Sequence, residues 1–181
     1  MKTAAQWPVF ECLISECWRD TANLTEILIS KEPPFGGVAC CVFLVDLGCL
    51  GPKQGFVTQF RTKAEYEHEL RSLMMSRNPM FQADYCLAAK ILRESIAYSS
   101  RLGFKLPPEV LQALSALGSL EEAASECQED IALGAPDGKP VYMAGPDDDV
   151  DRIMSILTAS CGHGNFHFTV PQSPIPPDFF D

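Results

Sequence analysis

Hydrophobic residues in the first 60 positions follow patterns typical of β-strands. Residues 24–30 (LTEILIS) alternate along the chain and are rich in β-branched side chains, which predicts a strand. Residues 38–48 (VACCVFLVDLG) are apolar on both alternating faces, as expected for a strand in the middle of a sheet. Residues 55–60 (GFVTQF) predict a third, shorter strand. Consecutive strands with short, Pro- and Gly-containing connections predict an antiparallel meander.

From residue 62 onward, apolar positions recur at the spacing of three and four residues that amphipathic helices show. The pattern predicts helices over residues 62–78, 81–101 and 107–118. Thr62 is the expected N-cap of the first helix, because Glu65 lies three residues later and completes a capping box.

The last third of the chain combines shorter elements. Residues 131–145 predict a hairpin around a Pro-Asp-Gly turn, residues 146–162 a helix and residues 164–170 a strand. The expected fold class is therefore α+β. We expect a mainly antiparallel sheet, made of the three-strand meander, the later hairpin and the C-terminal strand, covered by three to four helices. We expect residues 1–170 to form a single domain, followed by a Pro-rich extended tail at residues 171–181.

The charge of the chain is strongly negative and unevenly distributed. The formal net charge is −10, with −10 in residues 111–181 and +2 in residues 61–110. Such a field repels phosphate backbones, so a general duplex-binding surface is disfavoured. The basic middle includes Lys90, Arg93 and Arg101 on one predicted helix, where local contact with single-stranded nucleic acid is the alternative to simple solvation.

The amino-terminal residues lack the features of a signal peptide, and no apolar run approaches the ~18 residues of a spanning helix. We therefore expect a cytoplasmic protein without a membrane partner. In that reducing compartment the eight cysteines are expected to be free thiols.

Asp46 ends the apolar run VFLVD and is the first candidate for chemistry. A carboxylate at the end of a buried strand can bind a metal, as in ribonuclease-H-like nucleases, if further carboxylates converge on it. The candidates are Asp84, Glu94 and Asp147, and Mg would be the cofactor of this alternative. The structural alternative is that Asp46 accepts hydrogen bonds from backbone N–H groups of the turn that follows.

Cys49 lies in the same loop, near Lys53, and is the candidate for a nucleophilic thiolate. The alternative is a buried, unreactive thiol. The Gly-Pro-Lys sequence of this loop does not match a phosphate-binding loop, because the GxxxxGK[ST] spacing is absent.

Cys161, His163 and His167 have the side-chain types that bind zinc, although a structural zinc site needs four ligands. The alternative is a strand with solvated polar positions. The run of aspartates from Asp147 to Asp151 lacks the spacing of a calcium loop and fits the first turn of a helix, where carboxylates interact favourably with the helix dipole.

The tail PIPPDFFD places two aromatic residues on a segment that proline stiffens. Such a segment loses little entropy on docking into a groove, which makes Pro176, Pro177, Phe179 and Phe180 candidates for binding a protein partner.

The sequences FLVDLGCLGPK, GKPVYMAGPDDDVDRIM and GNFHF resemble those of an uncharacterised family of bacterial hypothetical proteins. The resemblance covers most of the chain, implies one domain and carries no catalytic motif. The leading hypothesis is a non-enzymatic intracellular binding or adaptor domain that acts within a larger assembly and needs no cofactor. The alternatives are a metal-dependent nuclease or phosphodiesterase and a cysteine-based enzyme, with Mg or Zn as the divalent metal of a metal-dependent site.

Overall fold

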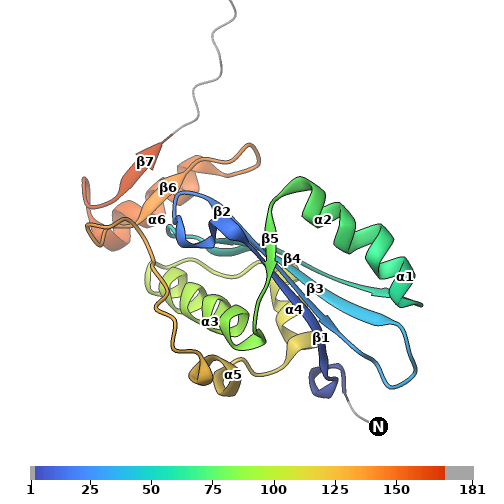
Figure 1. Cartoon of the computed structure of the whole chain (residues 1–181). Coiled ribbons are helices and arrows are strands. Elements are labelled where there is room, and N and C mark those ends of the chain that lie inside the picture. The colour runs from blue at the N-terminus through green and yellow to red at the C-terminus, as the bar shows by residue number, and fades with distance from the viewer. Residues whose placement is uncertain (1–2, 170–181) are drawn as a thin grey trace, which may run out of the picture.

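The computed structural model describes residues 3–169. Its main feature is a five-stranded antiparallel sheet of order β4-β3-β2-β1-β5 (Figure 1). The strands are β1 (Val9–Ser15), β2 (Leu24–Lys31), β3 (Val38–Asp46), β4 (Gly51–Phe60) and β5 (Met80–Gln82). The three predicted strands are β2, β3 and β4, and their meander is confirmed.

Helices cover both faces of the sheet, as Figure 1 shows. One face carries α3 and α4, with α5 beside α3; we call it the α3–α4 face. The other carries α1 and α2 and is called the α1–α2 face. The helices are α1 (Lys63–Tyr66), which continues through a π-helical turn (Glu67–Arg71) into α2 (Ser72–Arg77), and α3 (Tyr85–Arg101), α4 (Pro108–Leu117) and α5 (Glu121–Glu126).

Alternation along β3 explains why it lies in the middle of the sheet. Cys41, Phe43 and Val45 are buried against the α3–α4 face. Cys40 and Val42 belong to the separate core under α1 and α2. Successive side chains of a strand point to opposite faces, so a continuous apolar run suits a strand that is covered on both sides.

The C-terminal part forms a smaller unit at one end of the sheet. It contains a parallel pair of strands, β6 (Val141–Met143) and β7 (His167–Thr169), joined by α6 (Val150–Cys161). Two hydrogen bonds attach the unit to the turn after β3: Gly134 N donates to Leu47 O at 2.9 Å, and Val141 N donates to Gly48 O at 3.1 Å.

The predicted α+β class is confirmed, whereas the expected hairpin at residues 131–145 is wrong. Only residues 141–143 of that segment form a strand, and their partner is β7, in parallel. The Pro-Asp-Gly sequence does make a local turn, with Gly138 N donating to Ala135 O at 2.9 Å. The chain before this turn instead runs along the end of the sheet, because its backbone pairs with Leu47.

Within residues 3–169, no helix combines the length and the apolar character that crossing a bilayer requires. All eight cysteines carry free thiols, as predicted.

Candidate functional site

Asp46 closes the turn between β3 and β4. Its Oδ1 accepts hydrogen bonds from Cys49 N at 2.8 Å and Leu50 N at 3.4 Å. The residue is 6% exposed. Burial raises the pKa of Asp46, although these backbone N–H groups and the nearby Lys53 favour the charged form. The structure therefore gives Asp46 the turn-capping role that the sequence left open.

Lys53 and Asp148 form a largely enclosed ion pair beside this turn. Lys53 Nζ lies 2.7 Å from Asp148 Oδ1 and 2.9 Å from Oδ2. The Tyr142 hydroxyl and Gly145 N also donate to Oδ2, at 3.1 and 2.9 Å. Burial would raise the pKa of Asp148, but Lys53 and these two donors outweigh it and the pKa is lowered. The pair connects β4 with the segment after β6.

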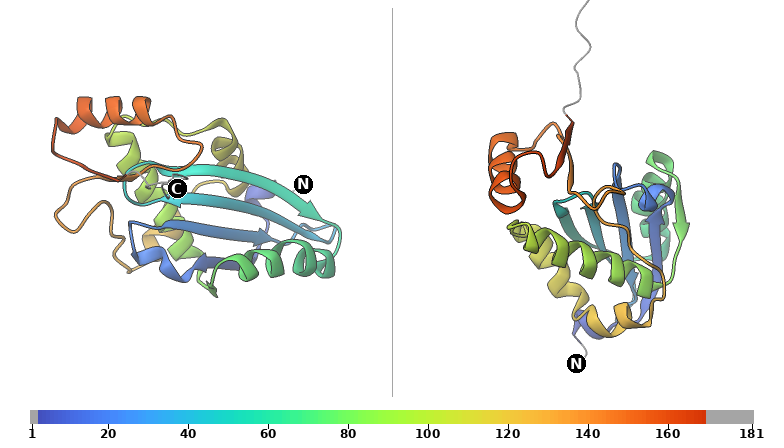
Figure 2. Two further views of the ribbon diagram at one scale, coloured as in Figure 1. Left: turned by 90° about the horizontal axis from the view of Figure 1, so that it is seen from above. Right: turned by 90° about the vertical axis from the view of Figure 1, so that its left-hand side faces the viewer.

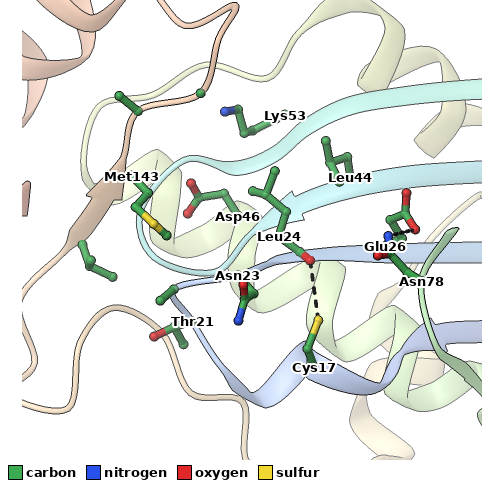
Figure 3. Close-up of a pocket in the computed structure, with 14 residues that line it drawn as sticks. Cys17, Thr21, Asn23, Leu24, Glu26, Leu44, Asp46, Lys53, Asn78 and Met143 are labelled. Carbon is green, nitrogen blue, oxygen red and sulfur yellow. Dashed lines mark hydrogen bonds between the residues drawn. The ribbon is translucent and has the colours of Figure 1, made fainter. Parts of the chain in front are cut away.

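A hollow of about 450 Å³ lies on the α1–α2 face of the sheet, beside these groups (Figure 3). Strands β2 and β3 form its floor, Asn78 at the end of α2 lies on one side, and β6 lies on the other. Its walls are apolar, and the polar side chains stand at the base and the rim. The residues that line it include Leu24, Glu26, Leu44, Asp46, Lys53 and Met143.

Replacing Asp148 with asparagine is expected to lower the free energy of unfolding by about 1–2 kcal/mol at neutral pH, because the ion pair with Lys53 is lost. A carboxyl whose folded pKa is lowered contributes stability above its unfolded pKa and loses it as the pH falls through the folded value. The difference in the free energy of unfolding between wild type and Asp148→Asn should thus shrink as the pH falls below 3.8, the ordinary pKa of an aspartate carboxyl. Urea unfolding at several pH values measures both effects.

Asp151→Asn is the matched control, because Asp151 lies on the exposed first turn of α6. It is expected to change stability by less than about 0.5 kcal/mol at neutral pH. A deficit for Asp148→Asn that stayed constant down to low pH would contradict the assigned ion pair.

The four acids proposed for a metal-dependent nuclease do not converge. Asp84 precedes α3 as its N-cap residue. Glu94 pairs with Arg93 at 2.8 Å. Asp147 lines a different hollow from the one at Asp46. Across residues 3–169, no three His, Cys, Asp or Glu side chains are grouped so that they could hold a metal ion, so the geometry gives the Mg alternative no support.

The thiol and zinc alternatives also lack a supporting arrangement. Cys49 is 0% exposed, and burial, followed by the charge of Asp46, raises the pKa of its thiol, which disfavours a reactive thiolate. His167 Nε2 lies 2.8 Å from Asp137 Oδ2. Cys161 is half-buried next to Ser160, and His163 is exposed. These three zinc candidates are not grouped around one point.

The basic residues of α3 are largely used inside the fold. Lys90 Nζ donates to the carbonyl oxygens of Cys127 at 3.1 Å and Glu129 at 2.5 Å. These two hydrogen bonds attach the segment after α5 to α3. Arg93 pairs with Glu94 and, at 3.6 Å, with Glu121.

Arg101 lies 5.8 Å from the centre of the Tyr98 ring. The Lys90 and Arg93 interactions leave little of this helix for a nucleic acid. The proposed partner-binding residues Pro176, Pro177, Phe179 and Phe180 lie outside the described residues.

Asp46, Lys53 and the aspartate run that contains Asp148 all stand out in the sequence, but the ion pair between Lys53 and Asp148 was not predicted from it. Lys53 and Asp148 are 95 positions apart, and they meet where β6 contacts the turn after β3 and Tyr142 packs with Cys49 in a shared apolar core. Two features of the sequence point to this ion pair: Lys53 is an isolated lysine shortly after a buried strand, and a run of aspartates lies far along the chain.

Comparison of the chain with protein-family models, curated proteins and solved structures finds no match.

Proposed function

We propose that this chain is a non-enzymatic, cytoplasmic binding or adaptor domain that receives an apolar segment of a protein partner. The observation that supports the proposal is an apolar part of the α1–α2 face, in and beside the hollow, that no helix of residues 3–169 covers. We call this surface the open face and define it by Leu24, Leu44, Phe56 and Met143.

The register of the sheet places the first three of these side chains together. Leu44 pairs with Gln54 of β4 and with Glu26 of β2. Phe56 lies two residues from Gln54 on β4, opposite Val42, and Leu24 lies two residues from Glu26 on β2, opposite Asp46, so all three side chains are on the same side of the sheet. Leu24 is 42% exposed and Phe56 is 49% exposed.

Helices α1 and α2 cover only one side of this face (Figure 2). Their buried residues Tyr66, Leu70 and Met74 pack on a core that includes Leu28 and Val42. Toward the turn that joins them, strands β3 and β4 continue without α1 or α2 above them, as the view from above shows. Met143 of β6, 40% exposed, adds to the apolar surface from the other side.

An apolar surface framed by polar groups favours protein binding. The reactive side chains of the described residues are dispersed, which is why binding is favoured over catalysis. Within residues 3–169, the ten-residue strand β4 pairs only with β3, so its outer edge is open to pairing with the backbone of an extended segment.

Photocrosslinking in cells of the native host tests the proposal. A benzophenone amino acid at position 56 should form a covalent adduct with a specific partner. The matched control carries the same group at Leu111, which is 53% exposed on α4, on the other side of the sheet. Adduct formation at position 56 alone supports the proposal, and equal labelling at both positions, or none, contradicts it.

A further inference from the structure

The hollow beside the open face contains a carboxylate with an unused oxygen atom. Asp46 is 6% exposed, and its Oδ1 receives the N–H groups of Cys49 and Leu50. Among residues 3–169, no group donates a hydrogen bond to Oδ2. The carboxylate nevertheless lines the hollow and faces into it (Figure 3). Oδ2 is not one of the fully buried polar atoms and stays accessible from the hollow, so a cationic ligand can reach it and donate a charge-assisted hydrogen bond.

The charges around the hollow indicate which donor is missing. Lys53 is the cation on its rim, and it is already held by both oxygens of Asp148. On the opposite side, Glu26 adds a second carboxylate, which receives a hydrogen bond from Asn78 Nδ2 at 2.8 Å. The lining therefore has surplus negative charge, and the chain as a whole carries −10. An anionic ligand would be repelled, whereas a cation would be attracted.

The shape and the walls of the hollow suit a long side chain with a charged end. Leu24 and Leu44 lie on the sheet, and Met143 faces them from β6. Lysine and arginine bury their methylene groups along such surfaces while the charged group reaches a polar partner. The volume of about 450 Å³ accommodates one side chain of this size.

We propose that the partner segment bound at the open face inserts a lysine or arginine side chain into this hollow, where its cationic group donates to Asp46 Oδ2. The inference rests on the proposed function, since it names the chemistry of the partner that the open face receives. An uncharged apolar side chain would fill the space but would leave Oδ2 without a donor.

The test uses a random 12-residue peptide display library as the probe and the full chain as the target. Selected peptides should carry arginine or lysine at one fixed position among apolar residues. Replacing that arginine with citrulline, which has a similar shape but no charge, should weaken binding at least about tenfold. Chemical-shift changes at the amides of Cys49 and Leu50 should report occupancy, because both donate to Asp46.

Two variants locate the effect. Asp46→Asn removes the charge but keeps an oxygen that accepts from the turn, and it should abolish the preference for arginine over citrulline. Leu24→Lys tests the same hollow without changing a residue of the turn that Asp46 caps. Leu24 is the cross-strand partner of Asp46, so a lysine there places its own ammonium in the hollow. It should weaken arginine peptides at least about tenfold, whereas Leu24→Met should change their affinity less than threefold.

The outcomes separate this inference from the proposed function. Peptides that bind the open face without a preference for arginine or lysine overturn the inference and leave the proposed function intact. Peptides that bind elsewhere, or no selected peptides at all, overturn both. A basic preference that Leu24→Lys removes and Leu24→Met retains supports both.

Discussion

Replacing Glu11 with alanine is expected to lower the free energy of unfolding by about 2–3 kcal/mol. Glu11 lies on β1 and its side chain is only 11% exposed. It accepts from the Tyr66 hydroxyl at 2.5 Å and from Arg71 Nε at 2.9 and 3.0 Å. Without it, the hydroxyl of Tyr66, a residue that is 1% exposed, loses its acceptor, and Arg71 Nε loses one as well, although Arg71 Nη1 keeps its pairing with Glu67. Removing one partner of such a network costs more than the net value of the contact. Urea unfolding measures the loss.

Glu67→Ala is the matched control for this prediction. Glu67 pairs with the same guanidinium at 2.9 Å, but its side chain is 55% exposed. Exposed pairs four residues apart on a helix contribute only about 0.3–0.5 kcal/mol. Equal losses for the two alanine variants would show that burial of the Glu11 network does not contribute as argued.

Glu11 and Tyr66 illustrate how enclosed polar groups attach distant segments to the sheet. Lys31 does the same on the other face, where its Nζ donates to the carbonyl oxygens of Ala4, Ala5 and Leu117 at 3.3, 3.0 and 3.0 Å. Burial lowers the pKa of this lysine, yet the three acceptors favour its charged form. Asp148 joins β6 to β4 by the same means. In these three cases a charged side chain connects elements that are far apart in the sequence.

Strong local patterns were sufficient to predict most of the regular elements. The alternation of residues 24–30 and the continuous apolar run at 38–46 correspond to β2 and β3 within one or two residues. Thr62 caps its helix as predicted, since its Oγ1 accepts from Glu65 N at 3.1 Å. Such patterns are local, because they depend on the periodicity of the backbone and on capping, so they can be recognised without knowledge of tertiary contacts.

The elements that sequence analysis missed are those whose pairing is non-local. In β1 (VFECLIS), a charged residue interrupts the apolar pattern, because Glu11 is required by Arg71 and Tyr66 on another segment. Strand β5 has only three residues and falls within the range predicted as the start of α3. The parallel pairing of β6 with β7 joins residues about 26 positions apart, and a short strand carries no information about its partner.

The candidate site was predictable only in its first residue. A carboxylate after a buried strand identifies Asp46 as a residue of interest. Its surroundings come from β2, β4, α2 and β6, and no pattern along the chain indicates that these meet. The expectation that the Asp46 turn would be solitary or catalytic left out a third possibility, which is that β6 encloses it and creates a hollow.

Gly48→Ala is expected to disrupt this enclosure and to weaken the binding of peptides at the hollow. A Cβ at position 48 would lie well inside van der Waals contact of the carbonyl oxygen of Val141 and close to its side chain. The backbone of β6 must therefore move away, and the hydrogen bond from Val141 N to Gly48 O is lost. We expect about 2–3 kcal/mol of destabilisation, because overlap with backbone atoms is relieved less easily than overlap with a flexible side chain.

Hydrogen exchange of the backbone amides measures this effect, because the loss of structure should be confined to the contact between β6 and the turn. The amide of Val141 should lose protection in Gly48→Ala, while amides in β2 and β3 should exchange only as fast as the reduced global stability requires. Affinity for open-face peptides should fall at least about tenfold, since Met143 and the rim of the hollow move with β6.

Gly36→Ala is the control. It adds a Cβ at a φ of +91° with nothing within 4 Å, so it should cost about 1 kcal/mol through backbone strain alone and leave both Val141 protection and peptide affinity unchanged. If Gly48→Ala kept the protection of Val141 and the peptide affinity, the packing of β6 against the turn would not be what forms the hollow.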